Sequence, residues 1–221
     1  MTIEIRSFQP SDLQECQNLF KRAHGEYGNS NIFMDYVLNS DMKDIETNYL
    51  NVTGGHWWVA VSTETNQIVG QIAILPLKIA DKSYYDSVPV DQRDRICELI
   101  RMGVNKEVQR LGVGIRLLTT LMDFARKNGY DKIHLTTGWH MDKARNFYEK
   151  NKFISDCIDK YLFDTDGKEG LTDQEKLASA FATRVRFNVG SIIPDEDQEK
   201  MKDHPEKSKY LYIQHYLRVL D

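Results

Sequence analysis

The segment Cys97–Phe153 constrains the fold of this chain more than any other part of it. It has the pattern of a strand, a turn with glycines, an amphipathic helix, a second strand and a second helix. In the first of these helices Leu117, Leu121 and Phe124 recur at the spacing of one helical face. Two strands joined through one helix predict a βαβ unit, in which the strands lie parallel in one sheet.

The remaining patterns predict further strands and helices around this unit. Alternating or β-branched residues predict strands at 3–6, 56–62, 67–75, 96–104, 132–137, 153–163 and 210–219. Caps and apolar spacing predict helices from about Ser11, within 34–50, and at 113–127, 142–151 and 172–186. Asp142 is the expected N-cap of the fourth helix, and Thr172 with Glu175 forms a capping box for the last. Residues 76–95 and 194–208 are predicted to be loops.

Length and charge limit the class of protein. We expect residues 1–221 to form a single domain with an insertion at about 164–208. A net charge of −4 argues against binding nucleic acid by broad phosphate neutralisation. No apolar run is long enough for a membrane span, and the first residues lack the pattern of a signal peptide. Three dispersed cysteines are expected to be free thiols, so the cytoplasm, or alternatively the nucleus, is the expected compartment.

The turn before the first helix has the spacing Q-x-x-G-x-G, given by Gln109, Gly112 and Gly114. A glycine turn that enters a helix presents unpaired N–H groups and the positive end of the helix dipole, which together suit a phosphate. No Gly-Lys-Ser/Thr follows, and the pattern does not fit the dinucleotide fingerprint. Taken alone, the turn is as consistent with a tight strand-to-helix connection as with an anion-binding site. A nucleotide-binding protein that uses the turn for phosphates is a further alternative.

Two motifs together resemble the GNAT superfamily of acyl-CoA-dependent N-acetyltransferases. The first is Gln109-Arg110-Leu111-Gly112-Val113-Gly114 after a strand, and the second is Ala144-Arg145-Asn146-Phe147-Tyr148-Glu149-Lys150 with Phe153. The opening strand and helix, and a final strand at Tyr210–Val219, are similar to those of the family. The resemblance implies an α/β fold: a mixed, mostly antiparallel sheet with a splayed parallel strand pair and helices on both faces.

The resemblance also assigns a donor and the residues that bind it. The donor is acetyl-CoA, a co-substrate, and no metal is implied. The residues expected to bind it are Met102, Gly103, Val104, Gln109, Arg110, Leu111, Gly112, Val113, Gly114 and Arg145. The first three belong to the place where this strand of the family carries a bulge, and Gly103 suits irregular backbone.

Two residues are candidates for proton transfer. Acetylation of an amine needs the neutral amine, and the pKa of a lysine-like amine is about 10.4. Glu98 occupies the position of the general base in several family members, although it can instead be a carboxylate paired with Arg101 or with a residue of the insertion. Tyr148 is the family's general acid for the departing thiolate, although it can instead be a packing residue beside Phe147.

Several features depart from the family or are set aside. Met141 replaces an asparagine that contacts the cofactor arm, and Lys152 replaces a glycine, which suggests a different turn after the helix. His134 and His140 lack the spacing and partners of a metal site and are expected to be structural or surface residues. An EF-hand at 164–175 is rejected because Lys168 and Glu169 stand where calcium loops need a ligand and a glycine.

The acceptor is expected to be a primary amine, on a small molecule or on a peptide or protein, attacked directly in a ternary complex. The insertion carries eleven acidic residues against seven basic ones between Asp164 and Lys207, and this excess can attract a cation or merely be a solvated surface. No nucleic acid or membrane partner is expected. The alternative function is an acyl-CoA sensor or regulatory module without catalysis.

Overall fold

The structure is a computed structural model that describes residues 2–29, 31–162 and 172–220. These residues form two compact units. The first takes in the described residues of Met1–Asn29, Val37–His134 and Val219–Asp221, and the second those of Ser30–Tyr36 and Leu135–Arg218. Part of the predicted insertion, residues 164–171, lies outside the described residues, as does most of the rejected EF-hand segment.

The first unit contains four antiparallel strands in chain order. They are β1 (Ile3–Ser7), β2 (His56–Ser62), β3 (Ile68–Pro76) and β4 (Ile96–Val104). The fifth strand, β5 (Lys132–Gly138), begins in this unit and pairs parallel to β4, from Ile96–Lys132 to Glu98–His134. The βαβ prediction for this segment is therefore confirmed.

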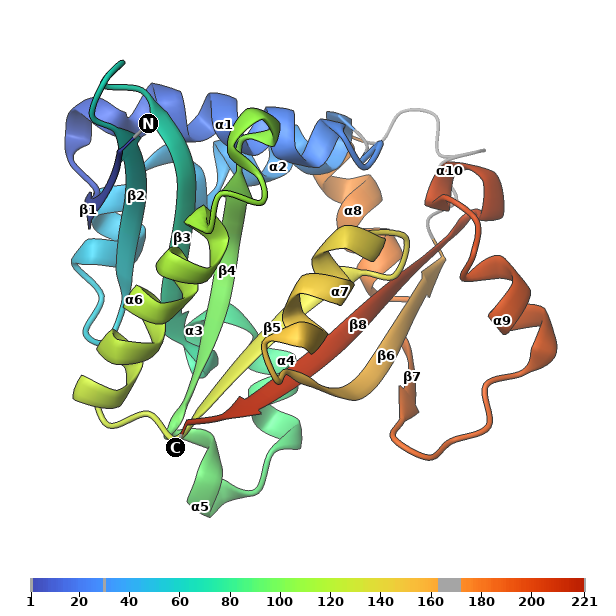
Figure 1. The fold of residues 1–221 in the computed structure, drawn as a ribbon. Helices are drawn as coiled ribbons and strands as arrows, with labels where there is room; N and C mark the ends of the chain where they lie inside the picture. The colour runs from blue at the N-terminus through green and yellow to red at the C-terminus, as the bar shows by residue number, and fades with distance from the viewer. Residues whose placement is uncertain (1, 30, 163–171, 221) are drawn as a thin grey trace. The chain divides into compact units, whose positions relative to one another are not determined.

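Helices cover both faces of these strands (Figure 1). On one face α6 (Val113–Lys127) packs through Phe124, whose ring contacts those of His56 and Trp58. On the other face the ring of Trp57 contacts that of Tyr49, and α1 packs against β3 and β4. The helical segments of this side are η1 (Pro10–Asp12), α1 (Leu13–Gly25), η2 (Asp41–Lys43) and η3 (Glu46–Leu50).

Two sequence predictions in the first unit are wrong in detail. The predicted loop 76–95 contains three short helices, α3 (Leu77–Ala80), α4 (Lys82–Ser87) and α5 (Val90–Arg93). The side chain of Asp81 caps α4 by accepting a hydrogen bond from the Tyr84 N–H at 2.8 Å, a short-range signal that the polar composition hid. The helix predicted within 34–50 is broken into α2 (Asn31–Asn39), η2 and η3.

The second unit contains antiparallel strands of its own. It holds α7 (Asp142–Lys150), β6 (Ile154–Leu162), α8 (Asp173–Phe181), β7 (Val185–Asn188), α9 (Asp195–Lys200), α10 (Pro205–Ser208) and β8 (Tyr210–Val219). β6 pairs with β8 on one side and with β7 on the other. The strand order is β1-β2-β3-β4-β5-β8-β6-β7, with β4 and β5 parallel. The predicted fold class, a mixed and mostly antiparallel sheet with helices, is confirmed.

The insertion is more regular than its sequence suggests. The capping box of Thr172 and Glu175 starts α8 as predicted, but this helix ends at Phe181 and not at 186. Residues 185–188 instead pair with β6 as β7, because Arg186 reaches Asp159 there. The predicted loop 194–208 contains α9 and α10.

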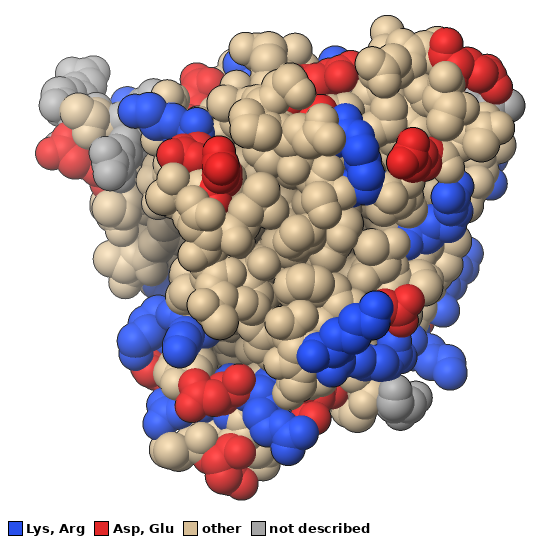
Figure 2. Space-filling view, turned by 90° about the vertical axis from the view of Figure 1, so that its left-hand side faces the viewer, with Lys and Arg blue, Asp and Glu red and all other residues tan. Residues whose placement is uncertain are grey.

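Two further observations concern the surface and the helices. Figure 2 shows a face on which Lys and Arg side chains lie close to Asp and Glu side chains around a largely uncharged area. Among the described residues, none of the helices combines the length and the apolar composition that crossing a bilayer requires.

Candidate functional site

The glycine turn has the geometry of an anion-binding helix entry. Gly112 precedes α6 with φ of +81°, a left-handed conformation that glycine adopts without strain. Arg110 shares this region, with φ of +68°. Because Gly112 has no side chain to cap the helix, the first N–H groups of α6 are left to solvent or to a ligand. Leu111 beside them is 62% exposed, so the turn lies open at the surface.

Packing holds this turn firmly against the sheet. Val108 and Val113 flank it and are buried. A Cβ on Gly70 of β3 would lie 3.1 Å from Val113 and 3.0 Å from Leu117, so the glycine lets α6 approach the strand closely. The Gln109 amide donates a long hydrogen bond of 3.4 Å to the Val104 carbonyl at the end of β4. Packing and this hydrogen bond therefore anchor both ends of the connection from β4 to α6.

The bulge predicted in β4 is present, but it lies earlier than expected. Gln71 of β3 pairs with Gly103, and Ala73 pairs with Ile100. One residue of β3 between these pairs therefore lies opposite two residues of β4. The irregular residue is Arg101, with φ of +55°, and not Gly103, which pairs regularly with Gln71. The expected bulge at 102–104 is corrected to Arg101 and Met102.

Glu98 is buried next to a histidine that sequence reasoning assigned no role. Glu98 is 4% exposed, and its Oε2 lies 3.5 Å from Nδ1 of His134, its cross-strand partner on β5. The His134 ring stacks on Tyr84 of α4 with centroids 3.9 Å apart. Arg101, the partner considered for Glu98 from sequence, instead bonds Asp41. Only parallel pairing of β4 with β5 brings Glu98 and His134 together, so no local pattern indicates it.

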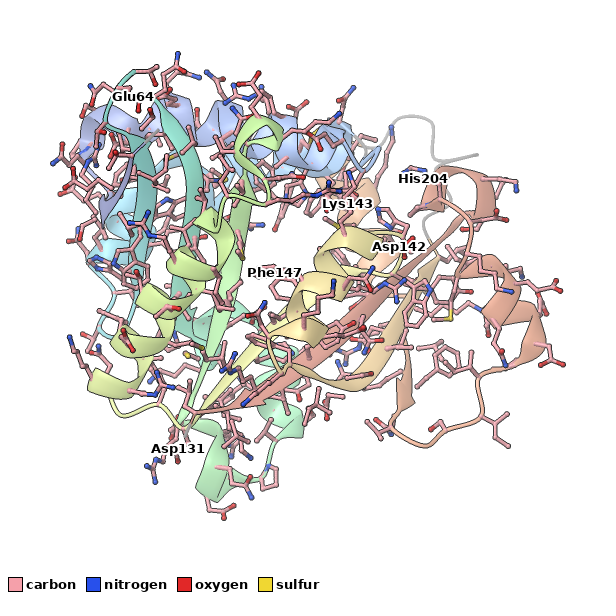
Figure 3. The ribbon with its side chains drawn as sticks, in the orientation of Figure 1. Glu64, Asp131, Asp142, Lys143, Phe147 and His204 are labelled. Atoms are coloured by element: carbon pink, nitrogen blue, oxygen red, sulfur yellow. The ribbon has the colours of Figure 1, made fainter. Side chains whose placement is uncertain are left out.

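The second unit holds the other predicted site residues, on α7. Tyr148 is 8% exposed, and its ring packs edge-on against Phe147 and Phe153 at 5.6 Å each. Figure 3 shows Phe147 on the same helix, with Asp142 and Lys143 at its start. Tyr148 is therefore both packed, as the structural alternative required, and placed on the motif helix.

Arg145 is held on α7 by two neighbours. Its guanidinium lies over the Trp139 ring, 4.3 Å from the centroid, and forms an ion pair with Asp142. The N-cap of α7 is Met141, and Asp142, the predicted cap, is its first residue. Lys152 adopts φ of +62°, so the position keeps the left-handed conformation for which glycine is usual, and the expectation of a different turn is corrected.

One cluster in the second unit has metal-type side chains. Ligand atoms of Cys157, Asp159 and His215 lie within 4.8 Å of one another and are buried. However, both Asp159 oxygens accept hydrogen bonds of 2.6 Å from Arg186, and His215 Nε2 lies 3.1 Å from Oδ2. A guanidinium already occupies the position of a cation, so the cluster is an ion-pair network between β6, β7 and β8.

Comparison with known families identifies the class of protein. The model of the Acetyltransferase (GNAT) family matches residues 13–153. This range covers more than half of the chain and contains both motifs. The chain therefore belongs to the GNAT acetyltransferase family.

Individual relatives are more distant. The chain is 31% identical to human N-acetyltransferase 8 over 121 residues. This match covers 55% of this chain and 48% of that protein. It is 33% identical over 116 residues to rat N-acetyltransferase family 8 member 3, and the match covers 52% of this chain and 46% of that protein. The chain thus spans about half the length of the curated relatives it matches.

Solved structures share the fold. An acetyltransferase of the GNAT family from Staphylococcus aureus Mu50 has a TM-score of 0.60 at 20% identity, covering 100% of both chains. The PaiA N-acetyltransferase from Thermoplasma acidophilum, solved with coenzyme A, has a TM-score of 0.53 at 18% identity, covering 76% of this chain and 94% of that one. At these identities the likeness shows the fold alone.

Proposed function

We propose that this protein is an N-acetyltransferase that moves acetyl from acetyl-CoA to a primary amine by direct attack. The observation that carries the proposal is the uncapped start of α6 behind Gly112, inside the region that the family model matches. A pyrophosphate suits this place because backbone N–H groups and the helix dipole both favour an anion there. The coenzyme A complex of a structural neighbour agrees with this choice of donor.

The donor-binding residues have separate tasks in this proposal. The amides of Gly112, Val113 and Gly114 hold the pyrophosphate, since those of Gln109 and Leu111 donate to the carbonyls of Lys106 and Val108 at 3.3 Å. Leu111 offers exposed apolar surface beside it. The β4 backbone at 102–104 bonds the pantetheine arm, and Arg145 supplies a positive charge. Because the bulge precedes Gly103, it influences how the backbone groups of 102–104 are oriented.

The chemistry needs one base and one acid. Glu98 accepts the proton that the acceptor amine must lose, and the amine nitrogen then attacks the thioester carbonyl carbon. The C–S bond breaks as the amide forms, and Tyr148 donates its phenolic proton to the leaving sulfur. A backbone N–H of the β4 stretch stabilises the developing oxyanion. The burial of Glu98 and Tyr148 excludes bulk water from both groups.

The acceptor is proposed to be a small-molecule or peptide amine. In the insertion, three acids form ion pairs: Asp197 with Lys160, Glu196 with Lys200, and Asp203 with Lys207. Lys200 and Lys207 belong to the insertion and already count among its basic residues, so only Lys160 of β6 reduces the excess of acidic charge noted from the sequence. The excess of acidic charge in the insertion therefore stays available to attract a cationic acceptor.

A pair of measurements tests the function. Thermal-shift titrations with acetyl-CoA, CoA, ATP and NAD should show stabilisation by the first two only. A panel of amines, read by thiol release from acetyl-CoA, should then give turnover with at least one acceptor. Stronger stabilisation by ATP or NAD would favour a nucleotide-binding protein. Binding of acetyl-CoA without turnover on any amine would favour the sensor.

A further inference from the structure

The β4 bulge contains a conformation that its own residue disfavours. Arg101 has φ of +55° in the middle of a strand. For a residue other than glycine, the left-handed region is disfavoured because the Cβ atom lies too close to the following carbonyl oxygen. Such a residue keeps this conformation only when its surroundings hold it there. The side-chain contacts of Arg101 show what holds it.

Asp41 grips the Arg101 side chain through a two-point contact. Arg101 Nε donates to Asp41 Oδ2 and Nη2 donates to Oδ1, each at 2.8 Å. The Tyr49 hydroxyl also donates to Asp41. This planar fork fixes direction as well as distance, which a single ammonium contact would not do. Asp41 and Tyr49 come from η2 and η3, so the grip originates outside the sheet.

The surroundings make this contact stronger than a surface ion pair. The Arg101 and Asp41 side chains are 21% and 25% exposed, and the guanidinium lies 5.6 Å from the centroid of Phe20 on α1. Burial by itself raises the pKa of Asp41, but Arg101 and the hydroxyl donors lower it below its usual value. The carboxylate is therefore ionised at neutral pH and attracts the guanidinium continuously.

We propose that Asp41, gripping Arg101 from outside the sheet, is the positioning residue that holds the β4 bulge in the shape needed to bind the acyl-CoA arm. Arg101 lies three residues after Glu98 and directly before Met102. Its backbone therefore determines how the groups of 102–104 present themselves to a ligand. The inference rests on the proposed function for its ligand, but the conformation of the bulge can be measured without any ligand.

Substitutions of Asp41 and Arg101 test whether their contact holds the bulge in shape. Asp41→Asn removes the charge and weakens the fork, so the bulge should relax toward regular strand. Backbone amides at 101–104 should then exchange with deuterium faster, and the Kd for CoA by calorimetry should rise about tenfold. Glycine adopts the left-handed conformation without a grip, whereas alanine does not. The double variant Asp41→Asn with Arg101→Gly should return the Kd to within about threefold of wild type, and the double variant with Arg101→Ala should not.

Two further variants serve as controls. Asp12→Asn disrupts a comparable fork, because Arg6 bonds Asp12 at 2.7 and 2.9 Å in the same unit. It should lower stability without changing the Kd for CoA or exchange at 101–104. Tyr49→Phe removes only one donor to Asp41 and should fold even where Asp41→Asn does not. It should raise exchange at 101–104 and the Kd about two- to fourfold.

The possible failures are distinct. Unchanged exchange at 101–104 in Asp41→Asn, or in Tyr49→Phe if the former does not fold, overturns the inference. Equal rescue by glycine and alanine also overturns it, because the backbone conformation would then be irrelevant. If wild-type protein does not bind CoA, the proposed function is wrong, and the role of Asp41 in the bulge is decided by exchange alone.

Discussion

The ring of Tyr148 packs against other aromatic rings, so a test of its catalytic role must remove the hydroxyl and keep the ring. Tyr148→Phe keeps the ring and should leave the Kd for acetyl-CoA unchanged, while kcat falls about tenfold or more because the departing thiolate loses its acid. Tyr216→Phe is the matched control. The ring centroids of Tyr216 and Tyr148 are 6.4 Å apart, and the Tyr216 hydroxyl donates a hydrogen bond to Glu149. Steady-state kinetics measures both, and unchanged kcat in Tyr148→Phe would remove this residue from the mechanism.

The proposed role of Glu98 predicts how kcat/KM depends on pH. If Glu98 is the base, the reaction needs its carboxylate to take the proton of the amine. Glu98→Gln should therefore lose the acidic limb of the profile of kcat/KM against pH, together with most of the activity. Glu64→Gln, at an exposed position, should keep the wild-type profile. An acidic limb that persists in Glu98→Gln would assign the base to another group.

Gln71 is a buried polar residue that the proposed chemistry does not use. It is fully buried, and neither amide atom has a hydrogen-bond partner among the described residues. Since an unsatisfied buried amide is destabilising, Gln71→Met should raise the free energy of unfolding in urea by about 1 kcal/mol. Gln214→Met should lower it, because Gln214 Nε2 donates to Ser155, Cys157 and His215. A loss of stability in Gln71→Met would contradict the prediction.

Among the elements, β7 is joined to the sheet by the network around Asp159. Burial raises the pKa of Asp159, but the hydrogen bonds from Arg186 and His215 lower it well below the usual range. Asp159→Asn should lower the free energy of unfolding at pH 7 by about 3–5 kcal/mol, because Arg186 would lose its partner. This exceeds the median contribution of an exposed ion pair.

The pH dependence has a definite sign. A carboxylate with a lowered pKa in the folded state stabilises the protein at pH values above its unfolded-state pKa of about 3.9. This contribution decreases as the pH falls below that value toward the folded-state pKa. Wild type should therefore lose stability between about pH 4 and pH 2 more steeply than Asp159→Asn. Parallel curves from chemical unfolding over this range would contradict the prediction.

The elements also show why some sequence predictions are wrong. Helical spacing and the capping box predicted a helix from 172 to 186, and the capping box is present. The last residues of that range instead pair with β6, because Arg186 forms a buried ion pair with Asp159 on that strand. A contact across 27 residues outweighs local helix propensity, which differs by less than about 1 kcal/mol between most residues.

For the whole molecule, the state of the three thiols follows from their burial. Cys16, Cys97 and Cys157 are all free and buried. Burial raises the pKa of Cys16 and of Cys157 to about 12, and that of Cys97 still further. A thiol reagent at pH 8 should therefore react with none of them in the native protein and with all three in denaturant. Rapid reaction in the native state would show that a buried segment opens readily.

Local features of the sequence determined much of this protein. The strands β2, β4 and β8 and the helix α6 have the predicted bounds, because each is defined by neighbouring residues: alternation, β-branched side chains or a helical stripe. The residues of the two motifs resemble those of the family, and the family model covers both motifs. These signals act over a few residues, so a chain shows them before it is folded.

Only the tertiary structure decided which distant residues meet. Asp41 grips Arg101 across 60 residues, and this contact places the bulge at a residue that local rules would reject for a left-handed conformation. Parallel pairing brings His134 beside Glu98. Ion pairs and strand register depend on positions in space, because electrostatic and hydrogen-bond energies fall steeply with distance and ignore separation along the chain.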